Sequence, residues 1–222
     1  MKKTVVNEKM YALGAKSSVI REIFEYGNKR RAEIGAENVF DFSLGNPSVP
    51  APLIVNETMK KLLEEKDSVK LHGYTSAPGD LGVRRAIADY INENFGAGAS
   101  VSDIYMTVGA AASLTVSLNA LLIPGEEVIA IAPFFPEYRV FVEATGSKLV
   151  GVNTVDGTFQ IDAEDFEKAI TENTKGVIVN TPNNPSGVIL NSESTRAIVE
   201  ILERKEKEYG HPIFLLSDEP YR

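Results

Sequence analysis

Short apolar runs alternate along the chain with longer stretches in which apolar residues recur every three or four positions. The short runs predict strands, and the periodic stretches predict amphipathic helices. The predicted strands span residues 39–44, 104–108, 127–132, 148–152, 176–180 and 213–217. The predicted helices span residues 17–36, 52–66, 81–95, 110–122, 137–145, 163–171 and 192–209. This alternation predicts an α/β fold, with a mostly parallel sheet and helices on both faces.

Composition and charge narrow the classes of protein and site. The chain has 222 residues, 43% of them hydrophobic, and is long enough to bury a core without crosslinks. Its net charge of -8 would repel phosphate backbones, so we expect no nucleic-acid partner. There is no cysteine, and the two histidines, His72 and His211, are far apart in sequence. We therefore expect no disulfide, no metal site and no Ser-His-Asp triad.

Targeting signals are also missing from the sequence. The basic N-terminus lacks the apolar segment of a secretory leader, and no apolar stretch approaches eighteen residues. We therefore expect a cytoplasmic protein with no membrane partner.

In parallel sheets covered by helices, ligands bind at the carboxyl ends of the strands. One such exit, residues 107–113, contains small residues where a strand gives way to a helix. Gly109 permits a tight turn there, and Ala110 and Ala111 leave the first amides of the helix open to an anion. The alternative is close packing of the helix against the sheet. The segment matches neither GxGxxG nor the P-loop, so nucleotide binding loses its main support.

Three further strand exits bear polar or aromatic groups. Asn183 and Asn184 follow an apolar strand and suit a sharp turn, although a turn does not need both of them. Phe134 and Phe135 stand between two prolines and could either fill the core or stack on a flat ring. Asp218 follows a very apolar strand, so we expect it to have a positively charged partner; a helix cap or a structural salt bridge are the alternatives.

An anion cradle, an aromatic ring, an amide, a carboxylate and a phenol at strand exits together describe a site for pyridoxal 5'-phosphate. On these features the sequence resembles the fold-type I pyridoxal-phosphate enzymes, specifically the class I and II aminotransferases of the aspartate aminotransferase type. Seven landmarks in family order carry the resemblance: Leu44–Pro47, Tyr74–Gly79, Thr107–Ser113, Pro124–Val128, Ala132–Tyr138, Asn180–Gly187 and Ser217–Tyr221.

The resemblance implies a role for each matching residue. The amides of Ala110 and Ala111, which follow Gly109, would hold the cofactor phosphate. Phe135 would stack on the pyridine ring. Asp218 would pair with the ring nitrogen and keep it protonated.

The same resemblance implies that Asn184 and Tyr221 hydrogen-bond the 3'-oxygen of the cofactor, and that Asp218 and Tyr221 are the catalytic residues present. Gly45, together with Phe135 and Asn184, would contact the substrate. A homodimer is implied as well, because the tyrosine that matches Tyr74 reaches the phosphate of the neighbouring subunit in this family.

The implied reaction transfers an amino group from an L-amino acid to pyridoxal phosphate and then to a 2-oxo acid, with aspartate and 2-oxoglutarate as the default pair. In the family, the Schiff-base lysine and the arginine that clamps the substrate carboxylate follow later than Arg222. We therefore expect residues 1–50 to be an N-terminal arm or small-domain segment. We expect residues 51–222 to be an incomplete cofactor-binding large domain, inactive alone, with an uncovered sheet edge.

Three alternatives stay open. A pyridoxal-phosphate C–S lyase would share the fold and the cofactor residues. A non-catalytic fragment would only fold, associate or bind the cofactor weakly. A nucleotide-binding α/β domain is the third alternative, and it lacks both phosphate-binding fingerprints.

Overall fold

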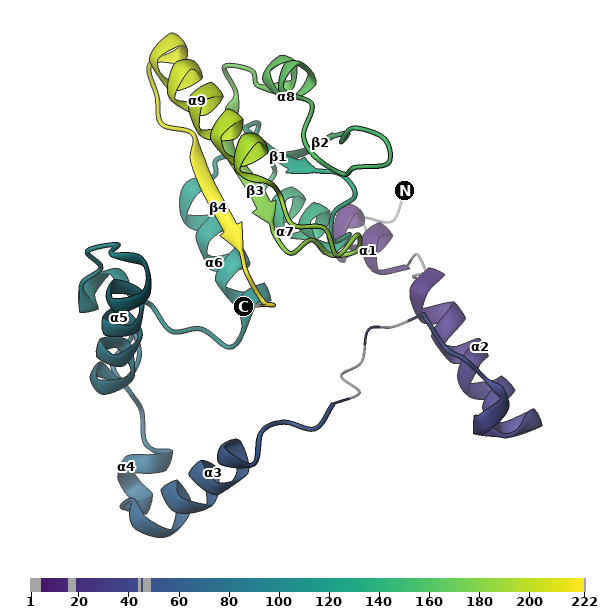
Figure 1. Cartoon of the computed structure of the whole chain (residues 1–222), viewed down its shortest axis with the longest axis vertical. Helices are drawn as coiled ribbons and strands as arrows, with labels where there is room; N and C mark the ends of the chain where they lie inside the picture. Colours follow the sequence, from purple (N-terminus) through teal and green to yellow (C-terminus); the bar gives the residue numbers. More distant parts are fainter. Residues whose placement is uncertain (1–4, 16–18, 44, 46–48, 222) are drawn as a thin grey trace. The chain divides into compact units, whose positions relative to one another are not determined.

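The computed structural model describes residues 5–15, 19–43, 45 and 49–221. The chain forms two compact units, of which the first ends at Ala77 and the second begins at Pro78 (Figure 1). The boundary predicted after residue 50 concerns the domains of a whole enzyme, and it stays a prediction.

The first unit is helical. It contains α1 (Glu8–Ala15), α2 (Val19–Ile34), the 3-10 helix η1 (Ala36–Asn38), α3 (Leu53–Glu65) and α4 (Ser68–His72). The helices predicted at 17–36 and 52–66 are confirmed by α2 and α3, although residues 17 and 18 lie outside the described part of the chain. The sequence pattern did not predict α1 or α4.

The strand predicted at 39–44 is wrong over its described residues, 39–43, which contain no strand. Phe40 and Phe42 are 83% and 95% exposed. Asp41 Oδ1 accepts a hydrogen bond from the backbone N–H of Ser43 at 2.9 Å. Such a local bond favours a turn over strand pairing. Leu44 lies outside the described residues.

The second unit is built on a parallel sheet of four strands. These are β1 (Glu127–Ile131), β2 (Lys148–Val152), β3 (Thr174–Asn180) and β4 (Phe214–Asp218), in the order β2-β1-β3-β4. All three pairings are parallel, which confirms the predicted sheet. The helices of this unit are α5 (Leu81–Phe95), η2 (Val101–Asp103), α6 (Ala110–Leu121), α7 (Glu137–Ala144), α8 (Ala163–Ala169) and α9 (Ser192–Tyr209). Across the described ranges, no helix is long and apolar enough to cross a membrane.

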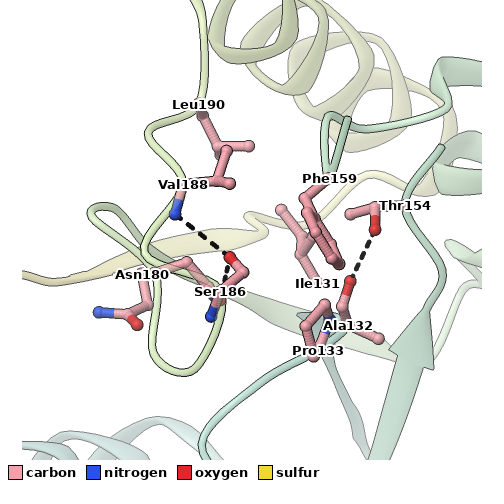
Figure 2. A pocket seen from close by; sticks show the side chains of 10 residues that line it. Ile131, Ala132, Pro133, Thr154, Phe159, Asn180, Ser186, Val188 and Leu190 are labelled. Carbon is pink, nitrogen blue, oxygen red and sulfur yellow. Dashed lines mark hydrogen bonds between the residues drawn. The ribbon is translucent and has the colours of Figure 1, made fainter. Parts of the chain in front are cut away.

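The segments that follow β1, β2 and β3 line a small cavity at the carboxyl ends of these strands (Figure 2). Thr154 Oγ1 donates a hydrogen bond to the carbonyl of Ala132 at 3.0 Å. Ser186 Oγ accepts one from the N–H of Val188 at 3.3 Å. The cavity between these segments measures about 10 Å³. It has room for about one water molecule and is too small for a larger ligand.

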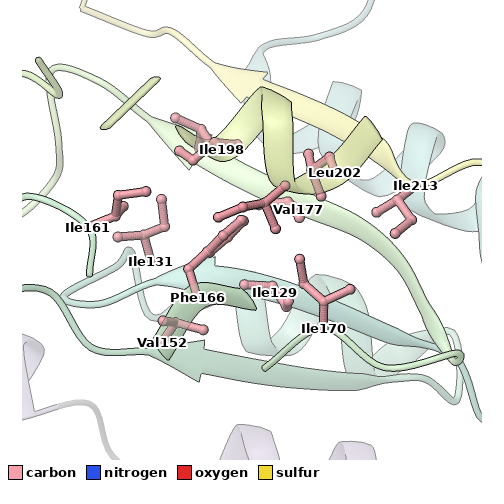
Figure 3. Close-up of a cluster of buried hydrophobic side chains, with 12 residues drawn as sticks. Ile129, Ile131, Val152, Ile161, Phe166, Ile170, Val177, Ile198, Leu202 and Ile213 are labelled. Atoms are coloured by element: carbon pink, nitrogen blue, oxygen red, sulfur yellow. The ribbon is translucent and has the colours of Figure 1, made fainter. Parts of the chain in front are cut away.

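Helices cover both faces of the sheet. Successive side chains of a strand point to opposite faces. On one face, Ile129 and Val177 pack with Phe166 of α8 (Figure 3). On the other face, Val128 and Ile178 pack in a cluster with residues of α6 and α7. All five side chains are at most 1% exposed, so the central strands β1 and β3 are buried on both faces, in agreement with the predicted helices on both faces of the sheet.

The strand predicted at 104–108 is wrong. In the part of the chain that the structure describes, this segment pairs with none of the four strands, and Val108 is 96% exposed. Apolar composition marks a segment that suits an extended conformation, but a strand also needs a neighbouring backbone to bond with. β4 is an edge strand, and its residues Phe214 and Leu215 are 38% and 46% exposed. Two apolar side chains of this edge strand are thus partly exposed within the second unit.

Candidate functional site

A cavity of about 210 Å³ lies in the second unit, where the carboxyl ends of β3 and β4 approach the first turn of α6. Six of the residues predicted from the sequence line it: Ala110, Ala111, Phe135, Asn184, Asp218 and Tyr221. Leu114, Phe141, Asn180 and Pro220 complete the lining. Gly109, also predicted, directly precedes α6. The structure therefore brings most of the predicted site together.

Two predicted residues belong to the first unit, which does not contain this cavity. Gly45 and Tyr74 are both exposed there. Their assigned contacts with a substrate and with a neighbouring subunit stay predictions.

The start of α6 is shaped to receive an anion. Gly109 has φ 97° and ψ 170°, a region of backbone conformation that is essentially restricted to glycine. The carbonyl of Gly109 accepts hydrogen bonds from the N–H groups of Ala112 and Ser113, both at 3.1 Å. The two preceding amides, those of Ala110 and Ala111, have no acceptor within the helix, as for any first turn. The helix dipole adds partial positive charge at this end.

Among the residues that the structure describes, no lysine, arginine or histidine side chain lines the cavity. An anion at the start of α6 would therefore depend on amide donors and the helix dipole. Asp218 contributes the carboxylate of the lining. The lining thus combines backbone amides that suit an anion with one acidic side chain.

The two asparagines of the loop after β3 have different surroundings. Asn183 Oδ1 accepts hydrogen bonds from Ser186 N at 3.1 Å and from Ser186 Oγ at 2.8 Å. The backbone of Asn183 also bonds to Gly187 and Val188. Asn183 therefore fits the turn interpretation, whereas Asn184 is the one of the pair that lines the cavity.

Phe135 combines the two roles that the sequence left open. It is half-buried and packs against the sheet face covered by α6 and α7, and it also lines the cavity. Its ring makes an edge-to-face contact with Tyr138, with a centroid separation of 5.7 Å. This contact fixes the orientation of a ring that a planar ligand could stack on.

The positively charged partner expected for Asp218 is not a side chain of the described residues. The ion pairs of the described residues do not include it. Instead, Asp218 Oδ2 accepts a hydrogen bond of 2.5 Å from the hydroxyl of Tyr138. A neutral donor satisfies the carboxylate without cancelling its charge. Burial, followed by the bond to Asp218, raises the pKa of Tyr138 above the usual range of a tyrosine.

Asn180 connects the strand ends to the loop. Its side-chain Nδ2 donates to the backbone carbonyl of Asp218 at 2.8 Å, and its Oδ1 accepts from the N–H of Asn184 at 2.6 Å. Sequence reasoning assigned no role to Asn180 or to Tyr138. The sequence contained one indication for each residue. Asn180 is an amide at the end of an otherwise apolar strand. Tyr138 has a hydroxyl group on the predicted apolar face of a helix.

Comparison with known proteins places these features in a family. The model of the family described as aminotransferase class I and II matches residues 37–222. A probable N-acetyl-LL-diaminopimelate aminotransferase of Bacillus subtilis (strain 168) is 33% identical over 205 residues, which cover 90% of this chain and 49% of that protein. An aspartate aminotransferase of Pyrococcus horikoshii is 30% identical over 207 residues, which cover 93% of this chain and 49% of that protein. The chain spans about half the length of the curated relatives it matches.

Solved structures agree with this similarity. The crystal structure of an aminotransferase from Eubacterium rectale matches with a TM-score of 0.95 and 53% identity, over 98% of this chain and 55% of that chain. An aspartate aminotransferase from Thermus thermophilus, solved with maleate, matches with a TM-score of 0.81 and 26% identity, over 98% of this chain and 54% of that chain.

The backbone of Gly109 leads to a stability prediction. Replacing Gly109 by Asn should lower the free energy of unfolding by about 1–3 kcal/mol, because its φ and ψ values suit glycine alone. Gly210, at φ 74° and ψ 21°, is the matched control. Asn tolerates that left-handed region, so Gly210→Asn should cost less than about 1 kcal/mol. Denaturant unfolding followed by circular dichroism measures both, and equal losses would contradict the strain assigned to Gly109.

Proposed function

Since the chain belongs to the class I and II aminotransferases, we propose that it binds pyridoxal 5'-phosphate in the cavity at the ends of β3 and β4. This cofactor site would serve an enzyme that transfers an amino group from an amino acid to a 2-oxo acid. The whole protein's activity is part of the proposal, because the chain covers about half of each relative compared above.

The observation that supports this function best is the arrangement of three kinds of group around one cavity. Ala110 and Ala111, the first residues of α6, line the cavity together with Asp218, which bears a carboxylate. Phe135 offers a flat aromatic surface in the same lining. A phosphate, a basic ring nitrogen and a planar ring are the features of pyridoxal phosphate that these groups suit.

The polar and aromatic residues of the lining would each bind a different part of the cofactor. Asp218 would keep a proton on the ring nitrogen through a charge-assisted hydrogen bond. Asn184 and Tyr221 would hydrogen-bond the 3'-oxygen, and Phe135 would hold the ring plane. When bound, the cofactor would supply an electron-accepting ring, and the protein would set its orientation and charge.

Aspartate and 2-oxoglutarate are the substrate pair that we propose to test first. Relatives named as aspartate aminotransferases support the choice of aspartate. We also propose a homodimer in which Tyr74 reaches the neighbouring subunit's phosphate, and a cytoplasmic location. The exposed ring of Tyr74 is compatible with such a contact.

The binding role of Asp218 gives a direct test of the cofactor proposal. Asp218→Ala should weaken binding of pyridoxal 5'-phosphate about 10- to 100-fold, because a hydrogen bond to a charged group is lost. The exposed Asp156 provides the matched control, Asp156→Ala, which should bind as the wild type does. Equilibrium dialysis measures both constants. Equal affinity of the two variants would contradict the assignment of Asp218.

An activity measurement tests whether transamination needs more of the protein than the 222-residue chain. No lysine lines the cavity in the described part of the chain, so the 222-residue chain with pyridoxal phosphate should not convert aspartate and 2-oxoglutarate faster than the free cofactor does. A protein of the relatives' length should convert them to the new keto acid without releasing ammonia. Borohydride fixation of the cofactor on one specific lysine of the 222-residue chain would contradict the first expectation. Ammonia release by the longer protein would point to a lyase.

A further inference from the structure

Tyr138 is a buried phenol behind the proposed cofactor site. It is the second residue of α7 and is 1% exposed. Its ring lies against Phe134 and Phe135, with centroid separations of 6.4 Å and 5.7 Å. A phenylalanine would fill nearly the same space, so the packing does not require the hydroxyl. A hydroxyl is costly to bury unless it is hydrogen-bonded, and its partner is Asp218.

Tyr138 does not line the cavity, whereas Asp218 does. The phenol therefore acts on a ligand only through the carboxylate. The bond from Tyr138 engages Oδ2, and within the described ranges no hydrogen bond to Oδ1 is found. Oδ2 is thus held by Tyr138, while Oδ1 has no donor among the described residues and is available to a ligand.

The backbone of Asp218 is held independently of its side chain. Asn180 Nδ2 donates to the Asp218 carbonyl at 2.8 Å, and the same two residues are opposite each other in the β3–β4 register. With the backbone fixed by β3, the hydroxyl of Tyr138 is the contact that selects the side-chain orientation of Asp218. The two constraints come from different elements, so one can be removed without the other.

A neutral donor has an electrostatic advantage over a cation at this position. A lysine or arginine beside Asp218 would offset the negative charge that a protonated ring nitrogen needs. A phenol that keeps its proton stabilises the carboxylate and leaves the net charge of the pair at -1. Asp218 and Tyr221 are the titratable groups that act on Tyr138, and both oppose loss of its proton.

We propose that Tyr138 is a positioning residue for the cofactor site: its hydroxyl holds the Asp218 carboxylate so that Oδ1 faces the protonated ring nitrogen of pyridoxal phosphate. This inference rests on the proposed function and adds to it a residue that touches neither cofactor nor substrate.

Two ligands that differ only at the ring nitrogen can distinguish a positioning role of the Tyr138 hydroxyl from a role in packing alone. Pyridoxal 5'-phosphate has the nitrogen, and its 1-deaza analogue has a C–H group in its place. Tyr138→Phe should weaken binding of pyridoxal phosphate about tenfold and leave binding of the deaza analogue unchanged. A merely structural role would weaken both equally. Tyr209→Phe is the matched control, because it removes a hydroxyl bonded to the Ile170 carbonyl at 3.2 Å, on α9; it should change neither affinity.

The outcomes distinguish this inference from the function on which it rests. If the wild-type chain binds pyridoxal phosphate no better than the deaza analogue, the role of Asp218 fails and that of Tyr138 fails with it. If the wild type prefers the nitrogen-containing ligand and Tyr138→Phe keeps the full preference, only the positioning role is overturned.

A second measurement does not depend on the folding of a Tyr138 variant. Burial and the bond to Asp218 raise the pKa of Tyr138, so tyrosinate absorbance should show a late step, above the usual range of a tyrosine. In Asp218→Asn this late step should move to lower pH, because the carboxylate charge that raises the pKa of Tyr138 is gone. Since the pKa is raised in the folded state, its stabilising contribution is complete below about pH 10 and is lost as the pH rises through the raised value. An unchanged late step in Asp218→Asn would overturn the proposed coupling.

Discussion

The parallel pairing of β3 with β4 determines where the polar groups of this protein can meet. The register sets Asn180 opposite Asp218, so the buried strand β3 and the more exposed edge strand β4 end in neighbouring polar residues. Because β1 also runs parallel to β3, the segment with Phe135 follows β1 on the same side of the sheet, where the carboxyl ends of the strands lie. α6 begins there as well, since its residues Ala110 and Ala111 share a cavity with Asp218. The chemistry of the site follows from this convergence.

Hydrogen bonds turn that convergence into a defined geometry. Tyr138 donates a hydrogen bond to the carboxylate of Asp218, and Asn180 donates one to its backbone carbonyl. The side chain of Asn180 in turn accepts a hydrogen bond from the N–H of Asn184. Every donor in the network is neutral, so the negative charge of Asp218 remains available to a cationic partner. The start of α6 supplies the complementary property, an end with free amides that attracts negative charge. A ligand with an anionic group and a basic ring suits both the amides and the carboxylate.

Much of this arrangement could be predicted from the sequence, because hydrophobic periodicity and strand-exit chemistry are local signals. Helices α5 and α9 and strand β2 have the bounds that the pattern predicted. The pattern failed where the outcome depends on a partner far away in the sequence. Segments 39–43 and 104–108 are apolar, yet pair with no strand in the described chain. The side chain that bonds to the Asp218 carboxylate is a phenol 80 residues away, and no local rule connects a residue on α7 with the end of β4.

A crystal structure of the chain with pyridoxamine 5'-phosphate would show whether this cavity binds the cofactor with its ring nitrogen on Asp218. The predicted result is a phosphate at the amides of Ala110 and Ala111, a ring against Phe135, and the ring nitrogen on Asp218 Oδ1 with Tyr138 still on Oδ2. A ligand bound at saturating concentration elsewhere on the protein, or with its ring nitrogen turned away from Asp218, would contradict the account.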